Sequence, residues 1–331
     1  MGLNIHALRL MLHAKEQGAD LERVVTIGRL DVLVTPGQLE EEFAAFRDPL
    51  KPGEAMQLIQ AEDRFCEPII KRIGARTVDA LDASDYEGAN ILHDLNRPLP
   101  DEHKKKYSLL LDGGTLEHVF HFPEALKSCM SMVEVGGHVL FALPANNEMG
   151  HGFYQFSPEL FFRALSDANG FQMRGLYLAP IYRDGEWLQV TDPAVLRQRV
   201  GHNRSIDEMG LLVFAQRVRD VPLLEQPPQQ SDYAVAWEEI DQAHRLEFFD
   251  QASAPADDGW KRKAKRLIPE PMLRIRRLIL AGKHVTTPPD PSQFTPYDPR
   301  LPHNRSAATQ VDERHIEAPK LGLRGSGGNS E

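Results

Sequence analysis

Apolar runs and amphipathic segments alternate through the first two thirds of the chain, and their spacing predicts strands and helices in turn. Apolar residues at helical spacing predict an amphipathic helix over residues 5–17. Short apolar runs that end in glycine, acidic or amide residues predict buried strands. These runs are RVVTIG (23–28), TVDALDAS (77–84), NILHDLN (90–96), SLLLD (108–112) and HVLFALP (138–144).

Helical segments are predicted between these strands. One follows Pro36-Gly37, and another spans about 63–73. A third starts at Pro123 and stops just before Gly136-Gly137, as proline at the start and glycine past the end of a helix indicate. A fourth opens at SPELFFRAL, where Ser157 can cap the first turn. This alternation predicts an α/β protein with a doubly wound, mostly parallel sheet.

Two more apolar runs complete a predicted seven-stranded sheet. They are FQMRGLYLAPIYR (171–183) and MGLLVFAQRV (209–218), separated by the polar stretch 184–208, and they could pair as an antiparallel edge. The pattern fades after Val218, where LLEQPPQQSD is typical of a linker. We therefore predict four parts: an N-terminal helix (1–19), a main domain (20–218), a linker with a basic helical extension (219–287) and a flexible, proline- and glycine-rich tail (288–331).

The composition fits a globular protein of a reducing compartment. The chain has 331 residues, of which 41% are hydrophobic and 26% charged, so it can bury a substantial core. Cys66 and Cys129 form no Cys-x-x-Cys pair and no cluster with histidine, which argues against a disulfide framework and a metal site. The sequence shows neither a signal peptide nor an apolar stretch long enough for a membrane span, and a cytoplasmic location is expected.

The net charge of −10 conceals a strong asymmetry. Residues 260–283 hold nine Lys/Arg and one Glu, a net charge of +8, which leaves −18 for the remainder. An acidic body argues against nonspecific nucleic-acid binding. Pro269 and Pro271 divide the basic segment into two short helices. Its apolar positions either pack on the acidic body, or the segment docks on an anionic membrane surface or an acidic partner.

Polar residues close several of the predicted strands. In an open parallel sheet, ligands bind outside the carboxyl ends of the strands, where Gly28, Asp82, Asp94, Asp112 and Asn146 would stand. An acid after the second strand can accept hydrogen bonds from both ribose hydroxyls, and one after the third can accept from an adenine amino group. The alternative is structural, because Asp and Asn favour strand ends and helix caps in any case.

The stretch YSLLLDGGTLEHVFHFPEALKSCMSMVEVGGHVLFALP (107–144) resembles the fourth strand, following helix and fifth strand of class I S-adenosylmethionine-dependent methyltransferases. TVDALDAS resembles their second strand with its ribose-binding acid, and ILHDLNRPLP their third strand with the acid near the adenine. The resemblance covers about residues 20–218 and implies a Rossmann-like methyltransferase fold with S-adenosylmethionine as cofactor. The residues that it implies for the cofactor are Gly28, Asp82, Ala83, Asp94, Leu95 and Asp112.

The loop after the first strand departs from the family pattern. The family has several glycines there, because only glycine lets the backbone approach the cofactor closely. This chain has VVTIGRLDVLVTPGQL, which keeps Gly28 but places Arg29, Leu30 and Asp31 where small residues are expected. Either the loop takes another path, or cofactor binding is weak or lost. The same loop lacks the Gly-x-Gly-x-x-Gly turn that a nicotinamide dinucleotide would need.

Candidate catalytic residues are two histidines near the strand ends. His151 lies in the loop PANNEMGHGFYQFSPE, and His118 follows the fourth strand; either could remove a proton near neutral pH. Asn146, Asn147 and Tyr154 of the same loop are candidates for substrate binding. The structural alternatives are a surface turn for the loop and a helix-start residue for His118.

Two functions remain open. The first is methyl transfer to a hydroxyl of a small or carbohydrate-like acceptor, supported by a general likeness to methyltransferase-like proteins of bacterial surface-polysaccharide pathways. A nucleobase acceptor is disfavoured, because the Asp/Asn-Pro-Pro-aromatic motif of base-methylating enzymes is replaced by Asp112-Gly113-Gly114-Thr115. The second is a noncatalytic methyltransferase-like binding protein, motivated by the altered first loop.

Overall fold

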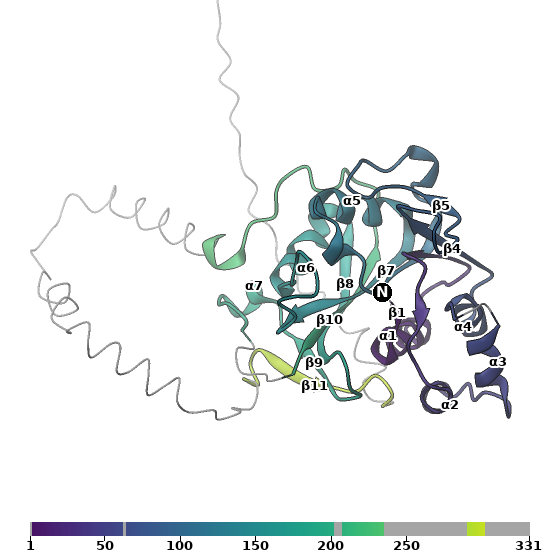
Figure 1. The fold of residues 1–331 in the computed structure, drawn as a ribbon. Coiled ribbons are helices and arrows are strands. Elements are labelled where there is room, and N and C mark those ends of the chain that lie inside the picture. The colour runs from purple at the N-terminus through teal and green to yellow at the C-terminus, as the bar shows by residue number, and fades with distance from the viewer. Residues whose placement is uncertain (1, 62–63, 202–206, 235–289, 302–331) are drawn as a thin grey trace, which may run out of the picture.

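The computed structural model describes residues 2–61, 64–201, 207–234 and 290–301, and its centre is a nine-stranded sheet (Figure 1). The strands follow one another across the sheet in the order β5-β4-β2-β6-β7-β10-β8-β9-β11. A separate two-stranded parallel sheet pairs β1 (Gly2–Leu3) with β3 (Asp31–Val32). The nine strands are β2 (Arg23–Ile27), β4 (Thr77–Asp82), β5 (Ile91–Leu92), β6 (Tyr107–Asp112), β7 (Val133–Asn146), β8 (Phe171–Pro180), β9 (Trp187–Val190), β10 (Met209–Arg217) and β11 (Phe294–Tyr297).

The directions of the strands confirm the predicted doubly wound class. From β5 to β7 all neighbouring strands pair in parallel, and the chain moves outward from β2 first through β4 and β5, then through β6 and β7. β10 is antiparallel to both β7 and β8. The two last predicted strands therefore do pair antiparallel, but β10 inserts between β7 and β8. The seven-stranded prediction is too small, because β9 and β11 extend the edge.

Helices cover both faces of the sheet, because successive apolar side chains of the central strands point to opposite faces and both faces must be buried. In β2, Val24 belongs to the core beneath α1, whereas Val25 and Ile27 belong to the core beneath α5 and α6. The helices are α1 (Ile5–Glu16), α2 (Pro36–Ala45), α3 (Glu54–Gln60) and α4 (Glu67–Ile73) on the first face, α5 (Phe122–Met132) and α6 (Pro158–Ala164) on the second, and the short α7 (Pro193–Leu196), with 3-10 turns η1 (Asp101–His103), η2 (Leu116–His118) and η3 (Asp167–Asn169).

The structure corrects two predicted helix boundaries. The helix placed at about 63–73 begins at Glu67, and α3 precedes it. The helix from Pro123 ends at Met132, because the chain enters β7 before Gly136-Gly137 is reached. Gly136 has φ +94°, and a Cβ on Gly137 would lie 2.7 Å from the carbonyl oxygen of Ser108. The two glycines thus lie at an irregular position within β7 and do not terminate a helix.

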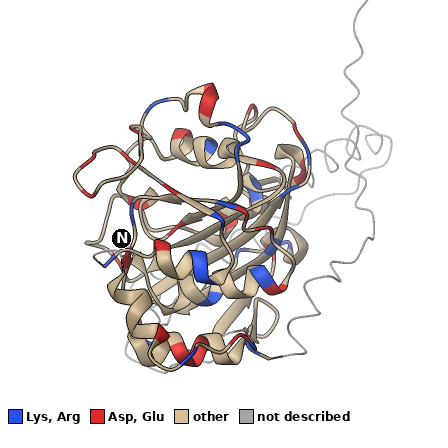
Figure 2. Ribbon diagram, turned by 90° about the vertical axis from the view of Figure 1, so that its right-hand side faces the viewer, with Lys and Arg blue, Asp and Glu red and all other residues tan. Residues whose placement is uncertain are grey.

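The N-terminal helix is part of the main core rather than an appendage. Arg9 of α1 is 1% exposed and forms a two-point ion pair with Glu42 of α2, with its Nε 2.9 Å from Oε2. Figure 2 turns the side of α2 to α4 to the viewer and shows acidic and basic residues interspersed along these helices. There Arg72 bridges Asp48 and Glu54.

Part of the predicted flexible tail is a strand. β11 pairs antiparallel with β9, and its end residues Phe294 and Tyr297 are buried, whereas the two between them are exposed. The hydroxyl of Tyr297 lies 3.1 Å from Nε2 of His13 in α1. The prediction of a flexible tail over 288–331 is therefore wrong for 294–297, because Phe294 and Tyr297 anchor this segment in the cores on the two opposite faces of the sheet.

The basic segment 260–283, with the predicted docking arm, lies outside the described residues. Among the residues that are described, no helix combines the length and the apolar character that a membrane crossing requires.

Candidate functional site

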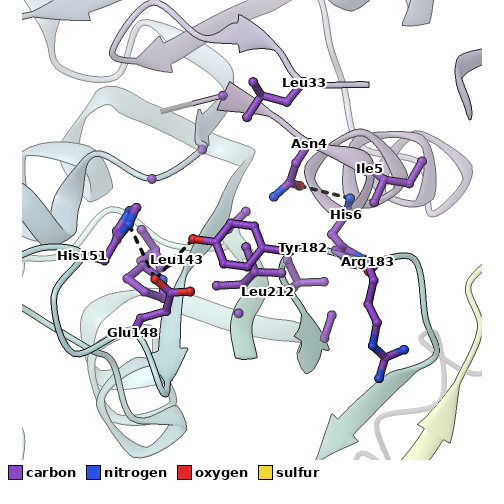
Figure 3. A pocket seen from close by; sticks show the side chains of 18 of the residues that line it. Asn4, Ile5, His6, Leu33, Leu143, Glu148, His151, Tyr182, Arg183 and Leu212 are labelled. Atoms are coloured by element: carbon purple, nitrogen blue, oxygen red, sulfur yellow. Dashed lines mark hydrogen bonds and ion pairs between the residues drawn. The ribbon is translucent and has the colours of Figure 1, made fainter. Parts of the chain in front are cut away.

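A cavity of about 290 Å³ opens at the carboxyl ends of β6, β7 and β8. Asn4 and, in the first turn of α1, His6 form one wall, and the loop after β7 forms the opposite one. Leu143 of β7 and Leu212 of β10 line an apolar floor (Figure 3). The site therefore lies beside the point between β2 and β6 where the strand order reverses, which is where ligands bind in doubly wound sheets.

Acidic and imidazole groups meet in the wall of this cavity. Nε2 of His151 lies 3.4 Å from Oε1 of Glu117, and Nε2 of His118 lies 3.8 Å from the same oxygen. Nδ1 of His151 lies 3.6 Å from Oε2 of Glu148, which also accepts a hydrogen bond from the hydroxyl of Tyr182 at 3.4 Å (Figure 3). The structure thus unites the two predicted catalytic histidines with two carboxylates.

The turn after β6 sets the position of Glu117 and His118. The buried carboxylate of Asp112 accepts hydrogen bonds from the backbone N–H groups of Gly114, Thr115 and Leu116 at 2.8–3.2 Å. Burial raises the pKa of Asp112 to about 6, while the three donors favour its ionised form. Asp112, predicted to bind the cofactor, here acts as the cap that folds η2, and its ligand role stays a prediction.

The loop after β7 is held against η2 by its backbone. The N–H of Phe153 donates to the carbonyl of Glu117 at 2.8 Å. A Cβ on Gly152 would lie 2.9 Å from the same carbonyl oxygen, so only glycine allows this approach. The close contact brings His151 next to Glu117.

Glu117 has an unusual environment for a carboxylate. It is 1% exposed, and within the described part of the chain neither of its carboxyl oxygens has a hydrogen-bond partner. Burial, followed by the negative charge of Asp112, raises the pKa of Glu117 to about 8. Burial and the neighbouring His151 lower the pKa of His118. The side chains of His118 and His151 are 43% and 41% exposed. The cluster therefore combines a buried carboxyl group with two imidazoles that solvent can reach.

The residues predicted for the nucleoside part of the cofactor stand together at a different place. The carboxyl ends of β2, β4 and β5 are adjacent, and the N–H of Gly28 donates to the carbonyl of Leu81 at 2.7 Å. Asp82 is half-buried and accepts from the N–H of Ser84 at 3.0 Å. Asp94 accepts from the N–H of Asn96, which lowers its pKa. Ala83 is exposed and Leu95 is buried in the core.

The altered first loop fills the space next to Gly28. Nε of Arg29 lies 2.6 Å from Oε1 of Glu67, and its Nη1 donates to the carbonyl of Glu87 at 2.9 Å. Leu30 is fully buried, and its methyl groups lie 3.1 and 3.3 Å from where a Cβ of Gly113 would stand. The N–H of Gly2 donates to the carbonyl of Gly113 at 3.0 Å, so the N-terminal segment also crosses this crevice.

The predicted substrate residues have structural partners. Nδ2 of Asn147 donates to the carbonyl of Asp207 at 2.8 Å, and the hydroxyl of Tyr154 donates to the carbonyl of Phe120 at 2.6 Å. Asn146 is half-buried and pairs with Met209 across the sheet. Of the predicted site residues, only His151 is among those that line the 290 Å³ cavity. The substrate role of the other three stays a prediction.

The sequence analysis did not select several residues of the cavity, namely Asn4, His6, Glu117, Glu148 and Tyr182. Glu148 carried a readable signal, because it precedes His151 by three residues in the same polar loop. Asn4, His6 and Tyr182 carried none, since only the packing of α1 and β8 brings them to the strand ends.

Solved structures with a similar fold include methyltransferases. The N-methyltransferase NodS from Bradyrhizobium japonicum has 11% identity and a TM-score of 0.34, with coverage of 65% of this chain and 94% of NodS. The branched-chain polyamine synthase from Thermus thermophilus has 13% identity and a TM-score of 0.33, with coverage of 68% of this chain. TehB from Haemophilus influenzae has 12% identity and a TM-score of 0.32, with coverage of 63% of this chain and 61% of TehB.

The chain spans 61% of the length of that polyamine synthase and 58% of its C9 mutein. No protein-family model and no curated protein matches the sequence. At such identities and TM-scores the likeness says nothing of activity or ligand. The fold rests on the sheet itself: five parallel strands wound in both directions from β2, with the antiparallel β10 between β7 and β8, form a doubly wound, Rossmann-like sheet.

Proposed function

We propose that the protein is an S-adenosylmethionine-dependent methyltransferase that acts on a hydroxyl of a small or carbohydrate-like acceptor. The observation that carries this proposal is the 290 Å³ cavity beside the reversal point of the sheet, with His151 and two carboxylates in its wall. A methyl donor over the ends of β2 and β6 would face this cavity across Gly113 and Gly114, which line it.

The groups in the cavity suit the chemistry of methyl transfer to oxygen. S-adenosylmethionine, when bound, would supply an electrophilic methyl group to the acceptor oxygen, with a neutral thioether as the leaving group. The protein has to align the two reactants and remove the hydroxyl proton. His151 is the proposed base, because Oε2 of Glu148 lies 3.6 Å from its Nδ1 and would stabilise the imidazolium that forms.

The lining of the cavity supports a small polar acceptor. Asn4 and Tyr182 supply hydrogen-bonding groups, while Leu143 and Leu212 supply apolar surface below (Figure 3). Sites for small ligands combine such an apolar lining with a few placed polar groups. A sugar ring with hydroxyls at its edge and C–H groups on its faces matches this combination.

One observation favours a second function, that of a noncatalytic methyltransferase-like binding protein. Arg29, Leu30 and the Gly2 backbone fill the crevice next to Gly28, where the family places the methionine part of the cofactor. In this function the cavity would still bind a ligand, but without a methyl donor.

Calorimetry of the full chain with S-adenosylmethionine, and separately with S-adenosylhomocysteine, distinguishes the two functions. Methyl transfer requires saturable binding of both compounds at one site per chain. A flat titration for both would sink the methyltransferase proposal and leave the binding function.

A further inference from the structure

We propose that Glu117, His118 and His151 form a binding site for one divalent transition-metal ion of the zinc type in the wall of the cavity. The inference stands on the geometry of these three side chains and does not depend on methyl transfer. The sequence predicted no metal site, because neither Cys66 nor Cys129 belongs to a Cys-x-x-Cys pair or to a cluster with histidine.

The three donor atoms lie at the separations that a metal ion needs. Oε1 of Glu117 is 3.4 Å from Nε2 of His151 and 3.8 Å from Nε2 of His118, and all three donors lie within 4.8 Å of one another. With metal–ligand bonds of about 2.0–2.1 Å, ligands of a tetrahedral ion stand roughly 3.3 Å apart. Small rotations of the two half-exposed imidazoles would close the remaining gap.

The buried carboxylate points independently to a cation. Glu117 is 1% exposed and lines the cavity, and among the described residues neither of its oxygens has a hydrogen-bond partner. Buried polar groups in native proteins are nearly always satisfied, so an unsatisfied carboxyl group needs an explanation. A metal ion bound to Oε1 supplies the missing partner.

A second carboxylate stands where it would orient a ligating histidine. Oε2 of Glu148 lies 3.6 Å from Nδ1 of His151 (Figure 3), whereas Glu117 faces the other ring nitrogen, Nε2. The side chain of Glu148 is 6% exposed, and the hydroxyl of Tyr182 donates to the same oxygen. Histidines that bind metals commonly give their other N–H to a carboxylate, which fixes the tautomer and strengthens the ligand.

The donor set defines the class of ion. Two imidazoles and one carboxylate suit zinc and neighbouring transition metals, whereas magnesium and calcium prefer oxygen ligands alone. Three protein ligands leave at least one coordination position open toward the cavity, which is typical of catalytic rather than structural zinc. Metal binding would use the Nε2 lone pair of His151, and so would make this residue a ligand instead of the free base.

The test uses the untagged full chain, stripped with a chelator and then dialysed. Zn²⁺ is titrated by calorimetry, and Co²⁺ by its visible absorption bands, which report tetrahedral or five-coordinate geometry. We expect one ion per chain and much weaker binding of Mg²⁺. Glu117→Gln, His118→Gln and His151→Gln should each weaken Zn²⁺ binding at least about 100-fold, and Glu148→Gln about 10- to 100-fold.

His121→Gln is the matched control, because His121 is an exposed histidine three residues after His118 and lies outside the cluster. Its affinity for Zn²⁺ should equal that of the wild type. His118 and His151 are half-exposed, so their variants keep the core and remain informative even if Glu117→Gln does not fold.

Any one of three results would contradict the proposed metal site. These are the absence of stoichiometric Zn²⁺ binding, an affinity unchanged in His118→Gln or His151→Gln, and a Mg²⁺ affinity equal to that for Zn²⁺.

Discussion

Carboxylates stand at the strand ends in two regions of this molecule, and the two regions differ in what surrounds them. At the ends of β4 and β5, Asp82 and Asp94 accept hydrogen bonds from nearby backbone N–H groups and remain partly exposed. Beyond β6 and β7, Glu117 and Glu148 are buried and lie within 4 Å of imidazole nitrogens in the wall of a cavity. The carboxylates of the first region are therefore satisfied by nearby backbone, whereas Glu117 in the second has no hydrogen-bond partner among the described residues.

This difference shows where the protein has kept room for a ligand. The crevice next to the first region is filled by Arg29 and Leu30, and the N-terminal segment crosses it. The second region is hollow, and it keeps an unsatisfied buried carboxyl group at the expense of stability. Methyl transfer needs both regions, so experiments that separate them test the proposed function most directly.

The largest effect is expected from His151. In the full chain, His151→Gln should lower the initial rate of labelled methyl transfer to the best acceptor of a sugar panel by about 100- to 10,000-fold, because the proposed base is lost. His118→Gln should lower it less than tenfold if His151 acts as a free base. Equal losses of rate in both variants would contradict the role of His151 as a free base and would favour its role as a metal ligand.

The next effect concerns pH and the wall of the cavity. His6 is 2% exposed; its Nδ1 accepts from Nε1–H of Trp187, and its Nε2 donates to the carbonyl of Arg183. Burial lowers the pKa of His6 from 6.5 to about 4, because loss of solvation disfavours the charged imidazolium. The unfolded chain binds this proton more readily, so the stabilisation is present above pH 6.5 and is lost as the pH falls toward 4.

Between pH 7 and pH 4.5 that loss should reach about 2.4 kcal/mol in the free energy of unfolding. Urea unfolding at pH 7 and pH 4.5 measures it, with His6→Gln as the reference in which all other groups titrate as before. If wild type and variant lose the same free energy of unfolding between these pH values, then protonation of His6 does not contribute to the pH dependence of stability.

A smaller effect is expected in the first region. If Asp82 binds the cofactor ribose, Asp82→Ala should weaken S-adenosylmethionine binding by ~1.5–3 kcal/mol, roughly tenfold to a hundredfold, without changing the thermal transition of the unliganded protein. Asp85→Ala, in the same exposed loop, is the control. An unchanged affinity in calorimetry would remove Asp82 from the site.

The smallest effect tests the backbone contact that joins His151 to Glu117. A Cβ at Gly152 would lie 2.9 Å from the Glu117 carbonyl oxygen, whereas one at Gly150 would meet nothing within 4 Å. Gly152→Ala should therefore destabilise the protein by about 1–3 kcal/mol, and Gly150→Ala by less than about 0.5 kcal/mol. Equal thermal transitions of the two variants would show that the loop yields without cost.

The local pattern of apolar residues was sufficient to predict most strands of the sheet. The runs of β2, β4, β6, β7, β8 and β10 alternate or stay apolar over strand length, and Pro158 after Ser157 marks a helix start that the structure confirms. β11 was missed because its composition is that of a loop, with Pro296 at its centre. Its pairing depends on the aromatic groups of α1 and β8, which are far away in the sequence.

The sequence alone determined the order of strands and helices, and it marked His118 and His151 as candidates, because both follow apolar runs that end at one edge of a parallel sheet. Tertiary structure decided what these candidates face. A residue's burial and its partners across the chain depend on packing between elements, so no local pattern could show that Glu117 would be enclosed without a hydrogen bond among the described residues, or that Arg29 and the N-terminal segment would fill the neighbouring crevice.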